Sequence, residues 1–125
     1  MTTQEILEAA RAAKTAVALS DGTTRNAALC GMADALGAPE HLDAILAANA
    51  EDMAAAKGKI SDVMLDRLAL TPQRIAAMAK GIRDVAALPD PVGRVLSRIQ
   101  RPNGLLIEKT AVPMGVIAII YESRP

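Results

Sequence analysis

A short β-branched run near the end of the chain constrains its fold more than any other feature. Val116-Ile117-Ala118-Ile119-Ile120 follows Gly115, is too short for a helix, and gives way to the polar residues Glu122-Ser123-Arg124. Such runs are typical of a parallel strand buried on both faces, and ligands in open α/β sheets bind beyond the carboxyl ends of these strands. A parallel strand needs neighbouring strands and crossover helices, so the pattern predicts the leading piece of a larger α/β enzyme.

Apolar residues at helical spacing mark the first part of the chain. One stripe runs from Gln4 to about Leu19 and predicts an amphipathic helix, which Ser20-Asp21-Gly22 ends. Thr23 or Thr24 is then expected to cap a second helix, because a hydroxyl oxygen can accept from the free amides of the first turn. About a fifth of the chain is alanine, which favours helices but offers little apolar area to bury.

Three more helices are predicted before residue 88. The third opens at Pro39, and Asn49 is expected to interrupt its apolar stripe. Ser61 or Asp62 caps a short fourth helix, and Thr71-Pro72 opens the fifth with proline at the first helical position. The apolar stripe of the fifth helix consists of Ile75, Met78, Ala79, Ile82 and Val85.

A proline-rich break separates these helices from a predicted hairpin. Leu88-Pro89-Asp90-Pro91 excludes helix because each proline fixes φ and lacks an amide donor. Residues 94–101 and 105–112 are rich in β-branched and alternating residues, and they flank Arg101-Pro102-Asn103-Gly104. This pattern predicts a type I turn in which Gly104 supplies the left-handed bulge residue. An isolated hairpin is marginally stable, so we expect it to contact another subunit or a further part of the polypeptide.

Composition and charge argue against several classes of partner. Fourteen basic and fourteen acidic residues balance, and no window concentrates lysine and arginine beside aromatic residues, so nucleic acid is not expected to bind. The longest apolar run is far short of the roughly 20 residues that span a bilayer. The single Cys30 excludes an internal disulfide and fits a reducing cytoplasm, and with His41 as the only histidine no metal site is expected.

Several strings of residues carry a resemblance to a known family. They are Ile45–Asp52, Leu65–Pro72, Leu88–Gly93, Arg101–Leu105, Val112–Ile117 and Ile120–Pro125. Their order and spacing resemble the N-terminal part of the aldehyde dehydrogenase superfamily and, within it, the gamma-glutamyl phosphate reductase (glutamate-5-semialdehyde dehydrogenase) family. The ending Tyr121-Glu122-Ser123-Arg124-Pro125 is the most diagnostic string, and the resemblance covers nearly the whole chain.

The resemblance implies an oxidoreductase of proline biosynthesis that uses NADP. Members of the family reduce gamma-glutamyl phosphate with NADPH to glutamate 5-semialdehyde and phosphate, through an acyl group carried on a cysteine thiolate. That nucleophile lies far downstream of the residues matched here, so no catalytic residue is expected in this chain. Cys30 is interpreted as a small buried hydrophobic residue, because it sits within a helix without a histidine nearby in sequence.

The resemblance also implies a binding site at the end of the predicted strand. Similar dehydrogenases place the ribose and nicotinamide of the cofactor against the backbone of this loop, here Ile120, Tyr121, Glu122 and Ser123. Arg124 has a planar fork of donors suited to the phosphate or carboxylate of the substrate, and the alternative is a solvated arginine. Many aldehyde dehydrogenases have Pro-Trp-Asn here, with the asparagine stabilising an oxyanion; Ser123, Arg124 or a residue beyond 125 could take that part.

Together these patterns predict an α+β fragment of an α/β enzyme. We expect a helical segment over residues 1–91, a hairpin of the oligomerisation type over 92–113, and the first strand of a Rossmann-like, NADP-binding domain over 114–125. A small-molecule substrate and a homo-oligomer formed through the hairpin are the expected partners, and the fragment alone is expected to be inactive. The alternative is a stand-alone helical interaction module without catalysis, which the incomplete site within 125 residues favours.

Overall fold

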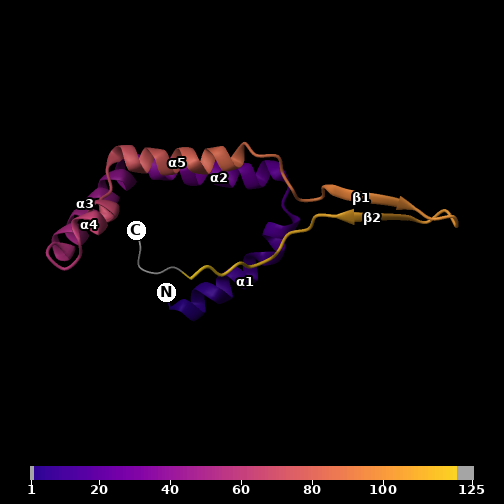
Figure 1. Cartoon of the computed structure of the whole chain (residues 1–125), viewed down its shortest axis with the longest axis horizontal. Coiled ribbons are helices and arrows are strands. Elements are labelled where there is room, and N and C mark those ends of the chain that lie inside the picture. Colours follow the sequence, from indigo (N-terminus) through magenta and orange to yellow (C-terminus); the bar gives the residue numbers. More distant parts are fainter. Residues whose placement is uncertain (1, 121–125) are drawn as a thin grey trace. The chain divides into compact units, whose positions relative to one another are not determined.

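A computed structural model describes residues 2–120 and contains, within that range, five helices followed by two strands (Figure 1). Its contacts divide the chain into two compact units. One contains the residues up to Arg25 together with Leu88–Ala118. The other contains Asn26–Ala87 and, among the described residues, Ile119 and Ile120. The division into three parts predicted from the sequence stays a prediction.

Helix α1 spans Thr3–Leu19 and confirms the first predicted helix. Its N-terminus is a capping box, in which the amide of Glu5 donates to Thr2 Oγ1 at 3.3 Å and the amide of Thr2 donates to Glu5 Oε2 at 2.7 Å. Ser20 follows the helix in an extended conformation, and its amide donates to the carbonyl of Ala16 at 3.1 Å. Both ends of α1 are therefore determined by residues adjacent to them in sequence.

Helix α2 spans Gly22–Gly37 and starts earlier than predicted. The amide of Thr24 donates to Asp21 Oδ1 at 2.7 Å, so Asp21 caps this helix and the prediction of Thr23 or Thr24 was wrong. Aspartate is among the strongest capping residues because its carboxylate also interacts favourably with the positive end of the helix dipole. The two threonines instead lie in the first turn of the helix.

The remaining helices begin where the capping residues predicted. Helix α3 spans Pro39–Ala56, α4 spans Asp62–Leu68, and α5 spans Pro72–Ala86. Ser61 caps α4 through the amide of Met64 at 3.4 Å, and Thr71 caps α5 through the amide of Arg74 at 3.1 Å. Figure 1 shows α5 running alongside α2, to which it is also linked by the ion pair between Arg83 and Asp34.

Asn49, at which the apolar stripe of α3 was predicted to be interrupted, is a buried polar residue within a continuous helix. Its Nδ2 donates to the carbonyl of Leu68 at 2.9 Å, and its Oδ1 accepts from the amide of Leu70 at 2.7 Å. Asn49 therefore satisfies two backbone groups in the link between α4 and α5, where neither helix provides partners for them.

The apolar core of the helical unit is small. Ile75 and Ala79 of α5 are 2% and 9% exposed, and Ala33 of α2 is 1% exposed. Met78 and Val85, which were predicted to be buried, are 51% and 55% exposed. With small alanines on the neighbouring helix, only a narrow stripe of α5 is covered, and its two larger flanking side chains stay at the surface.

The predicted hairpin is confirmed. Strands β1 (Val95–Gln100) and β2 (Leu106–Thr110) pair antiparallel, with Ile99 opposite Ile107 and an irregularity between Val95 and Ser97. Gly104 has φ of +86°, and its amide donates to the carbonyl of Arg101 at 2.9 Å, as the bulged turn requires. Every residue of both strands is exposed.

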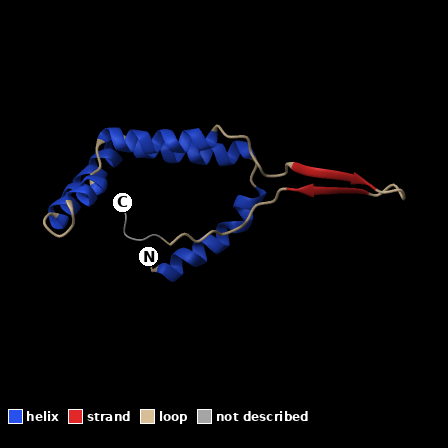
Figure 2. Cartoon of the chain, viewed as in Figure 1, coloured by secondary structure: helices blue, strands red, loops and turns tan. Residues whose placement is uncertain are grey.

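The predicted parallel strand is not confirmed. Residues 111–120 contain no strand, and Figure 2 draws this segment as a loop. A parallel strand is defined by hydrogen bonds to a neighbouring parallel strand, and the sheet within residues 2–120 contains only β1 and β2. No helix within this range is long and apolar enough to cross a membrane.

Candidate functional site

Residues 112–117 lead toward the predicted cofactor loop and lie along α1. Together with Pro91 and Val92 they line an apolar cavity of about 470 Å³ that is open to solvent. Ala10, Ala13 and Val17 of α1 form the opposite wall. Lys14 also lines this cavity and adds a positive charge to it. The cavity shows that this segment runs beside α1 without filling the space between them.

Gly115 gives this segment its change of direction. Its φ is +95°, a conformation that residues with a Cβ adopt only with strain. A Cβ at this position would also lie 3.0 Å from Cε of Lys14. The long lysine side chain could move away, so the backbone conformation is the stronger reason for glycine here.

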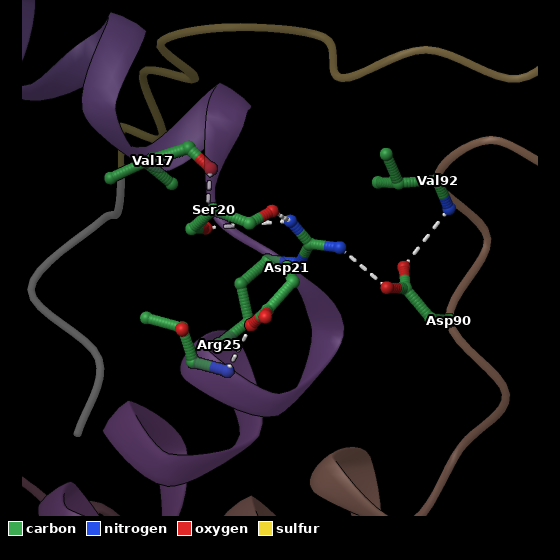
Figure 3. A network of polar contacts seen from close by, with 7 residues as sticks. Val17, Ser20, Asp21, Arg25, Asp90 and Val92 are labelled. Carbon is green, nitrogen blue, oxygen red and sulfur yellow. Dashed lines mark hydrogen bonds and ion pairs between the residues drawn. The ribbon is translucent and has the colours of Figure 1, made fainter.

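A polar network joins the start of α2 to the proline-rich segment (Figure 3). The guanidinium of Arg25 donates to the carbonyl oxygen of Ser20 and forms an ion pair with Oδ2 of Asp90. The other carboxylate oxygen of Asp90 accepts from the amide of Val92 at 3.0 Å. Arg25 and Asp90 are 24% and 37% exposed at their side chains, so the pair is partly shielded from water.

The carboxylates of this network are stabilised in their charged form. The backbone amide of Val92, followed by the guanidinium of Arg25, lowers the pKa of Asp90 below its ordinary value of 3.8. The backbone amide and hydroxyl of Thr24 lower the pKa of Asp21 in the same way. Both side chains are therefore charged at neutral pH, as ion pairing and helix capping require.

The network continues into the base of the hairpin through backbone hydrogen bonds. The amide of Gly93 donates to the carbonyl of Ala111 at 2.9 Å, and the amide of Ala111 donates to the carbonyl of Arg94 at 2.9 Å. Ala111 directly precedes the segment that lines the cavity. Contacts beginning at Arg25 thus reach the start of residues 112–117.

Only one residue of the predicted cofactor and substrate set lies in the described range. Ile120 is 97% exposed and belongs to no strand. Tyr121, Glu122, Ser123 and Arg124 lie outside the described residues, so their predicted roles stay predictions.

The network of Arg25 and Asp90 was missed by the sequence reasoning. The contact between Asp90 and Val92 had a local signal, because an aspartate whose side chain accepts from the amide two residues later is the pattern of an Asx turn. The ion pair between Arg25 and Asp90 had no local signal, because the two residues are 65 positions apart in the sequence. A distant ion pair of this kind cannot be found from periodicity or capping.

The two residues that the sequence analysis left without a role are also located. Cys30 on α2 is partly exposed, not buried as interpreted from the sequence. Arg83 interacts with Asp34 and, more weakly, with Cys30, and both raise the pKa of that arginine. Nδ1 of His41 lies 2.9 Å from the carbonyl oxygen of Ala35. No group of three or more metal-binding side chains occurs within residues 2–120.

Comparison with known proteins identifies the relatives of this chain. No family model matches it. Gamma-glutamyl phosphate reductases from Streptococcus pneumoniae strains Hungary19A-6 and ATCC 700669 are each 59% identical to it over 122 residues, which is 98% of this chain and 29% of the relative. The resemblance to gamma-glutamyl phosphate reductase is confirmed.

A solved structure supports the same relationship. The crystal structure of gamma-glutamyl phosphate reductase from Thermotoga maritima is 32% identical and superimposes with a TM-score of 0.82. The match covers 88% of this chain and 26% of that one. This chain thus spans well under a third of the length of the gamma-glutamyl phosphate reductases it matches.

Proposed function

We propose that the full-length protein carrying this chain reduces gamma-glutamyl phosphate to glutamate 5-semialdehyde in proline biosynthesis. NADPH supplies the hydride, and the products are the semialdehyde, NADP⁺ and phosphate. The identity of 59% over 98% of the chain to gamma-glutamyl phosphate reductases carries this proposal. The confirmed helices and hairpin, and the structural match to the Thermotoga enzyme, support it.

This chain contributes binding and positioning to that reaction rather than its nucleophile. Cys30 is part of α2 and lies beside Arg83 and Asp34 rather than a histidine that could accept its proton. The catalytic thiol is therefore assigned to the polypeptide beyond the residues matched here. The balanced charge of the sequence, in which no window concentrates lysine and arginine beside aromatic residues, fits a cytoplasmic enzyme that acts on a small molecule.

The cofactor and substrate sites are proposed at residues 120–124. The backbone of Ile120, Tyr121, Glu122 and Ser123 is assigned to NADPH, and Arg124 is assigned to the phosphate or carboxylate of the substrate. Residues 116–120 are proposed to form the first strand of a Rossmann-like sheet, because an apolar β-branched run pairs readily with neighbouring strands.

The reaction is tested most directly in the oxidative direction. The full-length protein is supplied with glutamate 5-semialdehyde, NADP⁺ and phosphate, and formation of NADPH is followed by absorbance. We expect NADPH to appear only when phosphate is present, because phosphate is the acceptor of the acyl group. NAD⁺ serves as the comparison nucleotide, and turnover without phosphate or with NAD⁺ alone would contradict the proposal.

Arg124→Lys separates the substrate role of this residue from a role in cofactor binding. Lysine keeps the charge but loses the two parallel hydrogen bonds of the guanidinium. A charge-assisted bond contributes about 1.5–3 kcal/mol, so kcat/KM for the semialdehyde or phosphate should fall at least about tenfold. The Kd for NADPH should stay unchanged, and an effect on NADPH alone would assign Arg124 to the cofactor.

The hairpin is proposed as the surface through which the protein forms a homo-oligomer. Its strands carry apolar side chains on exposed positions, including Ile99 and Ile107, which are 53% and 46% exposed. Ile107→Asp would place a charge in that contact, whereas Lys109→Asp changes a polar position of the same strand. Light scattering of the full-length protein should show a smaller particle only for Ile107→Asp, and an unchanged oligomer would exclude this surface.

A further inference from the structure

One guanidinium group connects the junction of α1 and α2 to the proline-rich segment. Arg25 donates to the carbonyl of Ser20, the residue that follows α1, and pairs with Asp90 at the same time. Asp90 is fixed from its other side by the amide of Val92 (Figure 3). The carboxylate is therefore held between two donors from different parts of the chain, which restricts its movement.

Gly22, at the start of α2, approaches the side chain of Asp90 closely. A Cβ added to Gly22 would lie 2.7 Å from Oδ2 of Asp90, well inside van der Waals contact. Gly22 is thus required for the close approach of a side chain, and its backbone φ is not among the positive values found in the described residues. Any side chain at position 22 must displace the carboxylate that Arg25 and Val92 hold.

Backbone hydrogen bonds link the neighbours of Asp90 in the chain to Ala111, which precedes residues 112–118. Val92 is followed by Gly93 and Arg94, which form the two backbone hydrogen bonds to Ala111. Ala111 leads into the segment beside α1, which Gly115 directs onward through its left-handed conformation. A series of contacts therefore leads from Gly22, Arg25 and Asp90 to Ala111, at the start of this segment.

We propose that Gly22, Arg25 and Asp90 are positioning residues for nucleotide binding, which they affect by fixing the backbone of residues 111–118. This inference rests on the proposed function, since it assumes that residues 120–123 bind NADPH. None of the three residues is assigned to contact the nucleotide or the substrate. They act through the hydrogen bonds of Gly93, Arg94 and Ala111.

The test uses two substitutions that disturb Asp90 in different ways. Gly22→Ala displaces the carboxylate without changing any charge, and Asp90→Asn keeps its shape but removes its charge. Gly31→Ala is the matched control for the first, because a Cβ at position 31 of the same helix meets nothing within 4 Å. Asp34→Asn is the control for the second, because Asp34 also pairs with an arginine, Arg83, in the other compact unit.

The first measurement is the Kd of the full-length protein for NADPH, by fluorescence titration, alongside its Tm. Gly22→Ala and Asp90→Asn should each raise the Kd about fivefold, the lower end of coupling between separate sites. Gly31→Ala and Asp34→Asn should leave it unchanged. A loss of Tm in the two test variants without any rise in Kd would show a purely structural role and overturn the proposal.

A second measurement does not depend on nucleotide binding. Amide hydrogen exchange at Gly93 and Ala111 should be several-fold faster in Gly22→Ala and Asp90→Asn than in the wild-type protein, and unchanged in the two controls. If the wild-type protein does not bind NADPH, the proposed function fails, while the exchange rates still decide whether these residues position the segment. Unchanged exchange at both amides would overturn the positioning role.

Discussion

The two compact units differ in the contacts within each. One unit contains residues 26–87, and the other contains residues 2–25 and 88–118. The first unit buries Ile75 at 2% exposure and satisfies two backbone groups with the buried side chain of Asn49. In the second unit, none of the described residues is buried, and Val112 and Met114 are 75% and 90% exposed. Both units contain ion pairs, such as Arg83 with Asp34 in the first and Arg25 with Asp90 in the second, so the units differ in burial rather than in charge.

The difference in burial indicates how each unit can be stabilised within a larger protein. A unit with its own buried side chains gains stability from burial and does not depend on further contacts for it. A unit with exposed apolar strands and an apolar cavity keeps its surface available for other parts of a larger protein or a second copy. The segment proposed to lead to the nucleotide belongs to the second kind, so its position depends on a few polar contacts.

The largest effect is expected from Ile75→Ala in the helical unit. Removing this buried side chain leaves a cavity and should lower the free energy of unfolding by about 3 kcal/mol. Ile99→Ala is the matched change in the hairpin, where Ile99 is 53% exposed, and it should cost less than about 1 kcal/mol. Chemical denaturation measures both, and equal losses would contradict the contrast between the two units.

The next effect is expected from a pair of asparagines. Asn49→Ala leaves the carbonyl of Leu68 and the amide of Leu70 without partners and should cost about 2 kcal/mol. Asn103→Ala removes an exposed contact in which Oδ1 accepts from the amide of Leu105 at 3.2 Å, and it should cost about 0.5 kcal/mol or less. If the two variants had the same denaturation midpoint, water would replace both contacts equally well, and the contrast would fail.

The predictions that the structure confirms concern contacts between residues close together in the sequence. Ser61 and Thr71 were predicted as caps, and Gly104 as a left-handed turn residue, because each interacts with groups within three residues along the chain. Local capping and turn chemistry therefore determined most helix ends and the hairpin. Asp21 was overlooked only because Thr23 and Thr24 competed with it for the same role.

The contacts that sequence reasoning missed depend on distant partners. The two hydrogen bonds of Asn49 were not predicted because their partners lie 19 and 21 residues away along the chain. The pairing of Arg25 with Asp90 across 65 residues has no periodic signal either. The strand predicted at residues 116–120 stays a prediction, because a parallel strand needs neighbouring strands to form its hydrogen bonds.

Two glycine-to-alanine substitutions should have smaller effects on stability, and these effects should be of opposite sign. Gly104→Ala places a Cβ on a residue with φ of +86° and should cost about 1–2 kcal/mol. Gly31→Ala lies within α2, where a Cβ meets nothing within 4 Å, and should stabilise the chain by about 0.5–1 kcal/mol. Thermal unfolding followed by circular dichroism measures both, and a destabilising Gly31→Ala would reveal a requirement for close packing on α2.

The smallest effect concerns pH and distinguishes the polar contacts of the two units. Because the pKa of folded Asp90 lies below its ordinary value of 3.8, its contribution to stability is fully present above that value. As the pH falls below 3.8 toward the folded pKa, the unfolded chain binds the proton first and the contribution is lost. Asn49 does not titrate, so its two hydrogen bonds contribute equally at both pH values.

Denaturation at about pH 7 and at about pH 3 tests this difference. The stability gap between the wild-type chain and Asp90→Asn should shrink at the lower pH, because protonation removes the same charge that the substitution removes. The gap between the wild-type chain and Asn49→Ala should stay constant. Asp21→Asn should behave like Asp90→Asn, since the amide and hydroxyl of Thr24 lower the pKa of Asp21 as well. A gap for Asp90→Asn that is independent of pH would mean that its hydrogen bond to Val92, rather than its charge, holds the proline-rich segment.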